Sequence, residues 1–237
     1  MDKKTKAKQP QSISTIGKIY LISYNLLLVI GWSYILCLLA RYYFTNNFKD
    51  QSLWNTVFSS LMIYQNAAVF EILHAFTGLV RSNPVITIFQ VFSRVMVVVG
   101  VLLATPPTAA AASIGLPIAL LAWSVTEIIR YGYYFANLVG FVPHFLVWLR
   151  YTTFIFLYPI GVTGELLCFY SAQQYAQKYP DVWSYALPNS WNMTFSYHYL
   201  LIAIMLLYIP LFPHLYLHMF SQRKKILGPG AKAGKAH

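Results

Sequence analysis

Three carboxylates lie inside the most apolar stretches of this sequence, where a charge is costly to place. The chain has only six acidic residues, and Glu71, Glu127 and Glu165 fall within long hydrophobic runs. A charged side chain at the centre of a bilayer costs at least ~2.5–3.5 kcal/mol, so such a residue normally faces a bundle interior or a wet cavity. A carboxylate held there can act as a general acid or base. These three residues are therefore the first candidates for function.

Each buried carboxylate needs a partner, and the spacing suggests some. Glu127 and Arg130 are three residues apart and so share one helix face, where they can form an ion pair that fixes helix packing. Glu71 and His74 have the same spacing. Helical metal centres use that motif at least twice, so we predict no metal site. Arg94 lies in the next apolar run and could pair with either carboxylate or extend to the interface.

The most informative stretch is Tyr158-Pro-Ile-Gly-Val-Thr-Gly-Glu165. Tyr158 and Glu165 are two helical turns apart, so they share a face and lie ~10 Å apart along the axis. Pro159 lacks a backbone donor and should kink the helix one turn earlier. Gly161 and Gly164 permit close approach of another helix or a ligand. A tyrosine beside a kink, on the same face as a buried carboxylate, favours a functional role for Tyr158 over simple packing or an interfacial position.

The elements that must position these residues are hydrophobic helices. Apolar runs of membrane-spanning length cover roughly residues 19–44, 53–80, 85–104, 114–136, 140–170 and 195–220. They are separated by polar segments, including a turn at 81–84 and loops at 105–113 and 173–194. The sequence therefore predicts an all-α polytopic membrane protein, a bundle of six transmembrane helices. We expect a disordered basic tail at 1–15, a membrane domain at 16–222 and a second basic tail at 223–237.

The composition agrees with a membrane protein and excludes other classes. The 237 residues are 58% hydrophobic and 10% charged, against about 25% charged residues in soluble domains. The net charge of +11 does not indicate nucleic-acid binding, because ten of the seventeen Lys and Arg residues lie in the tails or, for Lys18, just before the first apolar run. Such flanking charge predicts cytoplasmic termini and contact with anionic lipid headgroups. Two cysteines exclude a disulfide scaffold and a cysteine-rich metal site.

Several segments resemble the very-long-chain 3-hydroxyacyl-CoA dehydratases, once called protein-tyrosine-phosphatase-like proteins. The resemblance covers roughly residues 16–227, and its matching segments are 70–74, 89–94, 126–131, 150–151, 157–161, 164–167, 208–213 and 222–227. It implies six helices in the endoplasmic reticulum membrane and the third step of fatty-acid elongation, in which 3-hydroxyacyl-CoA loses water to give trans-2-enoyl-CoA. It also implies that Tyr158 and Glu165 form the catalytic pair. Phosphatase chemistry is not expected, because Ala75 stands where that reaction needs a cysteine nucleophile.

Elimination of water needs one group to remove the C2 proton and another to protonate the departing hydroxyl. We expect Glu165 as the base and Tyr158 as the proton donor, although the sequence leaves the reverse open. The acyl chain would lie between helices and CoA at the basic cytoplasmic face. Candidate substrate-binding or supporting residues are Arg150, Tyr151, Gly161, Glu71, His74, Arg94, Glu127 and Arg130, with Lys224 and Lys225 as further phosphate contacts.

Other functions remain open at this point. The three buried glutamates could instead form the relay of a proton-coupled transporter, although no internal repeat supports that fold. A non-catalytic scaffold of the elongation complex is a second alternative, against which the intact Tyr158 and Glu165 pair argues. The enzyme hypothesis needs no cofactor and no metal. Its expected partners are the acyl-CoA substrate, membrane lipid and other elongation enzymes, namely a condensing enzyme and reductases, and no nucleic acid.

Overall fold

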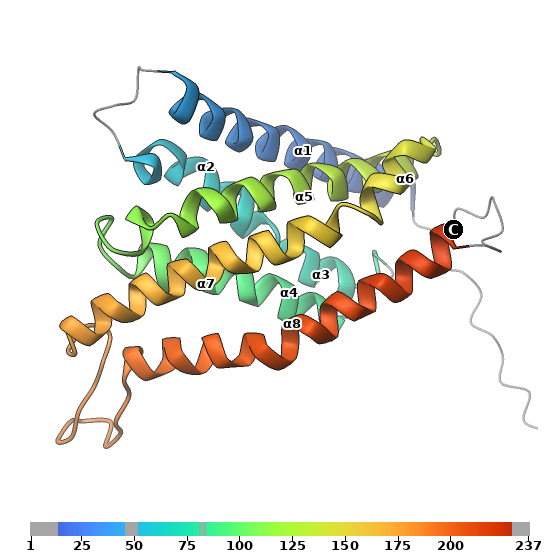
Figure 1. Ribbon diagram of the computed structural model, residues 1–237. Helices are drawn as coiled ribbons and strands as arrows, with labels where there is room; N and C mark the ends of the chain where they lie inside the picture. Colours follow the sequence, from blue (N-terminus) through green and yellow to red (C-terminus); the bar gives the residue numbers. More distant parts are fainter. Residues whose placement is uncertain (1–13, 46–51, 81, 83, 229–237) are drawn as a thin grey trace, which may run out of the picture.

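The computed structural model describes residues 14–45, 52–80, 82 and 84–228. Within these residues the chain is a bundle of helices and has no β-strand (Figure 1). The predicted all-α class is confirmed. The elements are α1 (Thr15–Phe44), α2 (Leu53–Ala67), α3 (Val69–Phe76), α4 (Pro84–Val97), the π-helix η2 (Val98–Leu103), the 3-10 helix η3 (Ala110–Ala112), α5 (Gly115–Val139), α6 (His144–Arg150), α7 (Phe154–Lys178) and α8 (Tyr197–Leu227).

Five helical segments of the described chain are long and apolar enough to cross a membrane. They are Thr15–Phe44, Leu53–Phe76, Pro84–Leu103, Phe154–Lys178 and Tyr197–Leu227. The predicted fourth span corresponds to α5, which is not among the five although it has 25 residues. Its hydropathy is lowered by a glutamate and an arginine that both lie within the bundle.

The central position of α5 follows from its close packing on both sides. Its most extensive contacts are with α1 and α7. A Cβ atom added to Gly164 of α7 would lie 2.5 Å from the backbone nitrogen of Ala119, and one added to Gly161 would lie 3.3 Å from the Cβ of Ala122. Gly161 and Gly164 therefore both allow close approach of α7 to the helix α5, and not to a ligand. At Gly164 only glycine fits without movement of the backbone.

Several predicted boundaries are wrong. The fifth apolar run, predicted as one span, is divided at residues 151–153 into α6 and α7, where the Thr153 hydroxyl bonds to the Leu149 carbonyl at 2.9 Å. The helix α7 continues to Lys178, beyond the predicted loop start, because Ala172 and Ala176 are buried by packing. The basic residues 223–225, assigned to the tail, belong to the last turns of α8. Most of the predicted tail 1–15, residues 229–237 of the other tail and half of the turn 81–84 lie outside the described residues.

Helix α7 tolerates Pro159 because another helix supplies the missing hydrogen bond. A proline has no N–H, so the carbonyl four residues earlier, that of Ile155, loses its helical donor. The Tyr216 hydroxyl of α8 donates to this carbonyl at 2.9 Å. The contact fastens the C-terminal half of α8 to the start of α7. In Figure 1 the start of α1, the end of α8 and α6 lie at the same end of the bundle.

Candidate active site

Glu165 is buried in the bundle and accepts a hydrogen bond on each carboxylate oxygen. Trp123 of α5 donates its indole N–H to Oε1 at 2.7 Å, and Tyr208 of α8 donates its hydroxyl to Oε2 at 2.7 Å. The Glu165 side chain therefore bridges from α7 to the helices on both of its sides. An indole N–H can only donate, so Oε1 must accept, as an oxygen of an ionised carboxylate does. This arrangement supplies a fixed carboxylate in an apolar setting.

Tyr158 lies two turns before Glu165 on α7, and the two side chains do not bond to each other. The ring of Tyr158 packs edge-on against Phe154, with the centroids 5.8 Å apart. Its hydroxyl makes no hydrogen bond to any residue in the described part of the chain. The Arg94 guanidinium of α4 interacts electrostatically with both Tyr158 and Glu165. The structure thus brings the predicted pair to one face of α7, beside a cation that the sequence placed on another helix.

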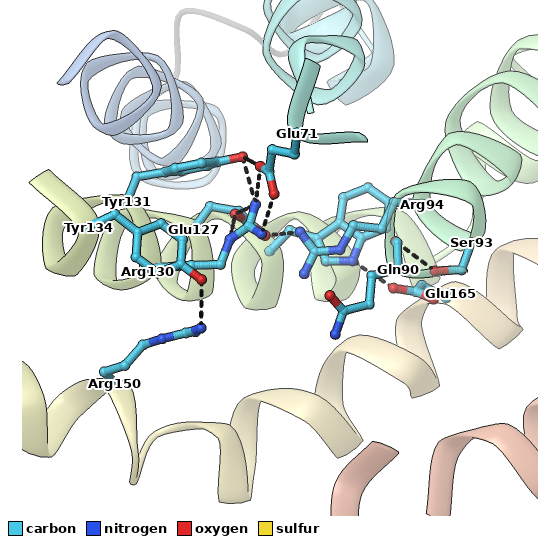
Figure 2. Close-up of polar contacts among 11 residues, drawn as sticks. Glu71, Gln90, Ser93, Arg94, Glu127, Arg130, Tyr131, Tyr134, Arg150 and Glu165 are labelled. Carbon is cyan, nitrogen blue, oxygen red and sulfur yellow. Dashed lines mark hydrogen bonds and ion pairs between the residues drawn. The ribbon is translucent and has the colours of Figure 1, made fainter. Parts of the chain in front are cut away.

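Four further charged residues, of which Glu127 is buried and the others are partly buried, form one network across three helices (Figure 2). Arg130 donates to both oxygens of Glu71, at 2.9 and 2.8 Å, and its Nε donates to Glu127 at 2.7 Å. The second oxygen of Glu127 is paired with Arg94. The Tyr131 hydroxyl donates to Glu71. The expected pairing of Glu127 with Arg130 is present, and Arg94, for which the sequence allowed two partners, pairs with Glu127.

Three other predicted residues lie away from Glu165. His74 shares a hydrogen bond with the Tyr20 hydroxyl at 2.9 Å, so its ring faces α1 and not the Glu165 side of the bundle. Arg150, at the end of α6, donates to the Tyr134 hydroxyl at 3.2 Å (Figure 2). Tyr151 follows it in the break between α6 and α7. Arg150 and Tyr151 are therefore placed at the α6 end of the bundle.

The sequence reasoning missed both hydrogen-bond donors to Glu165. Trp123 and Tyr208 lie 42 and 43 residues from Glu165 along the chain, so no helical spacing connects them with it. Tyrosine and tryptophan are also abundant here, with 19 and 6 copies, and many of them have ordinary packing roles. The one available signal was that Tyr208 begins one of the segments that carry the family resemblance.

The chain matches a known protein family over the region that contains this site. The family described as "Protein tyrosine phosphatase-like protein, PTPLA" matches residues 65–229, which include Trp123, Glu165 and Tyr208. The chain is 43% identical to the very-long-chain (3R)-3-hydroxyacyl-CoA dehydratase hpo-8 of Caenorhabditis elegans, over 90% of this chain and 96% of the relative. It is 41% identical to very-long-chain (3R)-3-hydroxyacyl-CoA dehydratase 2 of Mus musculus, over 94% and 85%.

A plant relative is similar along the same length. The very-long-chain (3R)-3-hydroxyacyl-CoA dehydratase PASTICCINO 2 of Arabidopsis thaliana is 34% identical, over 91% of this chain and 96% of its own. No solved structure matches the chain. The family match covers more than half of the sequence, and the relatives are matched over most of their length. This chain therefore belongs to the protein tyrosine phosphatase-like family, whose curated members are named very-long-chain 3-hydroxyacyl-CoA dehydratases.

Proposed function

We propose that this protein removes water from very-long-chain 3-hydroxyacyl-CoA to give trans-2-enoyl-CoA, the third step of fatty-acid elongation. The observation that carries the proposal is the buried Glu165 carboxylate, held by donors on both oxygens on the Tyr158 face of α7. The relatives of this chain are named very-long-chain (3R)-3-hydroxyacyl-CoA dehydratases, which supports the proposal. Glu165 and Tyr158 are the acid/base pair of the proposed mechanism.

The proposed elimination divides between the two side chains. Glu165 takes the C2 proton, the C2–H electron pair becomes the C2=C3 double bond, and the C3–O bond breaks as Tyr158 protonates the departing hydroxyl to give water. Two observations support this assignment over its reverse. Both oxygens of Glu165 accept hydrogen bonds, which partly offset the cost of burying the carboxylate form that a base requires. The Tyr158 hydroxyl is not engaged by a described residue and can donate to substrate.

The substrate's two parts suit two parts of the molecule. An apolar chain of very long length needs an apolar site, which a bundle of membrane-spanning helices offers around Glu165. The CoA phosphates need cations at one end of the bundle. Arg150 at the end of α6 and Lys224 and Lys225 at the end of α8 lie at the same end of the bundle (Figure 1) and remain the proposed contacts.

We also propose that α5 is the sixth span, within a catalytic membrane domain covering 16–222. Twenty-five residues give a helix of about 37 Å, which exceeds the ~30 Å hydrocarbon core. Its two ionic residues, Glu127 and Arg130, are paired within the bundle and so need not contact lipid. Six spans with basic flanking residues favour cytoplasmic termini. The proposal includes residence in the endoplasmic reticulum membrane beside the other elongation enzymes.

This topology predicts that the segment between α7 and α8 is lumenal. Protease added to sealed microsomes should leave residues 179–196 uncut, and detergent should expose them to cleavage. The acceptor sequon Asn192-Met-Thr194 lies in this segment but close to the start of α8 at Tyr197, so we expect little glycosylation there. Cleavage of the segment in sealed microsomes, with a lumenal marker protein intact as control, would contradict the topology.

One experiment separates the dehydratase from the transporter alternative. The protein is reconstituted in liposomes loaded with a pH-sensitive dye and supplied with a very-long-chain 3-hydroxyacyl-CoA. We expect trans-2-enoyl-CoA to accumulate without a proton flux across the membrane. Proton flux without enoyl-CoA would overturn the proposal in favour of transport. Neither product nor flux, from protein that remains folded, would favour a scaffold.

A further inference from the structure

Among the residues that the structure describes, Tyr208 is the one α8 side chain that forms a hydrogen bond with Glu165. It donates to Glu165 Oε2 at 2.7 Å, while Trp123 on the opposite side of α7 donates to Oε1. We propose that Tyr208 is a positioning residue that fixes the plane of the Glu165 carboxylate for proton transfer. This inference rests on the function proposed above.

Two donors are needed because one leaves the carboxylate free to rotate. The terminal torsion of a glutamate is broad, and a single hydrogen bond to Oε1 leaves the plane of the group loosely defined. Donors from α5 and α8 act on different oxygens, so together they define the plane and the direction of the remaining lone pairs. An error of about 1 Å in the position of a reacting group can cost roughly 10²-fold in rate.

The Tyr208 ring is held independently of its hydroxyl. The ring packs edge-on against Phe169 of α7 at a centroid distance of 5.9 Å, and Phe169 itself is fully buried. A phenylalanine at position 208 would keep this contact and lose only the hydrogen bond to Glu165. The hydroxyl is therefore not required for the α7–α8 packing.

A second tyrosine of α8 offers a matched control. Tyr216 also donates its hydroxyl to α7, but to the Ile155 carbonyl at 2.9 Å, ten residues before Glu165. Each of Tyr208→Phe and Tyr216→Phe thus removes one hydroxyl and one hydrogen bond between the same two helices. Only the first removes a contact with the proposed base. A general effect of loosening α8 would appear in both variants.

The test measures kcat, KM and the midpoint of thermal unfolding for both variants with a very-long-chain 3-hydroxyacyl-CoA. We expect Tyr208→Phe to lower kcat roughly 10- to 100-fold with KM changed less than about threefold. Tyr216→Phe should keep kcat within about threefold of wild type. Wild-type kcat in Tyr208→Phe, or an equal loss in both variants, would overturn the inference.

A double variant tests whether Tyr208 acts through Glu165. In a Glu165→Gln background, the additional change Tyr208→Phe should lower the residual rate by less than about twofold, because the base it positions is already absent. A further loss as large as in the wild-type background would overturn the inference. These outcomes are distinct from failure of the proposed function, in which the wild-type protein itself would give no enoyl-CoA.

Discussion

Glu165→Gln is expected to lower the rate of dehydration about 10²- to 10⁴-fold, the usual effect of losing a general acid or base. The fold should survive the change. Glutamine keeps one oxygen to accept from the Trp123 N–H, and its NH₂ group can donate to the Tyr208 oxygen, since a hydroxyl can reverse its role. The variant therefore removes the titratable group and keeps both contacts.

Tyr158→Phe should produce a loss of the same order for a different reason. Its hydroxyl bonds to no residue in the described ranges, so the change breaks no hydrogen bond of the protein and keeps the ring contact with Phe154. A large loss of the dehydration rate would then indicate that the proton donor is missing. The two losses should be non-additive in the double variant, because residues that act as a unit fail together.

The measurement is steady-state kcat with purified protein, accompanied by the midpoint of thermal unfolding for each variant. Near-normal turnover by folded Glu165→Gln would remove the proposed base from the mechanism. Near-normal turnover by folded Tyr158→Phe would do the same for the donor. If Glu165→Gln is active, the two hydrogen bonds to the Glu165 carboxylate would need an explanation other than catalysis.

Arg130→Leu is expected to destabilise the protein by about 3–5 kcal/mol, because it leaves buried charges without their partner. Arg130 makes two hydrogen bonds to Glu71 and one to Glu127. After the substitution Glu127 still has Arg94, whereas among the described residues Glu71 retains only the neutral Tyr131 hydroxyl. Most of the loss of stability should therefore come from the unpaired charge of Glu71.

The structure thereby specifies which second change should restore stability. Arg130→Leu combined with Glu71→Leu removes the stranded charge and should recover much of the thermal midpoint in detergent. The matched control, Arg130→Leu with Glu127→Leu, removes the partner suggested by sequence spacing and also deprives Arg94 of its carboxylate, so it should recover less. A wild-type midpoint for Arg130→Leu, or the opposite order of rescue, would contradict the network.

Local patterns in the sequence predicted the helices and singled out the carboxylates within them, but not the partners of those carboxylates. The carboxylates at 71, 127 and 165 stand out because they interrupt apolar runs, and the pairing of Glu127 with Arg130 follows from a three-residue spacing within one helix. The pairing of Glu71 with Arg130 joins helices whose relative rotation the sequence does not encode locally. The pairing of Glu71 with Arg130 becomes visible only when the packing of α5 against its neighbours is known.

Helix ends were less predictable than helix existence. The break at 151–153 lies in a continuous apolar run, so hydropathy favoured one span across it. The extension of α7 to Lys178 depends on the burial of Ala172 and Ala176, which the polar residues around them conceal. Conversely, α5 was predicted correctly as a helix, although its charged residues keep it below the hydropathy of the other five.

The central claim is that this protein dehydrates a very-long-chain 3-hydroxyacyl-CoA at Glu165. The most direct measurement incubates purified wild-type protein and purified Glu165→Gln protein with that substrate and follows trans-2-enoyl-CoA by mass spectrometry. We expect enoyl-CoA to accumulate in proportion to the amount of wild-type protein. The rate with the variant should be at least about 10²-fold lower. No enoyl-CoA from folded wild-type protein, or equal rates from both, would contradict it.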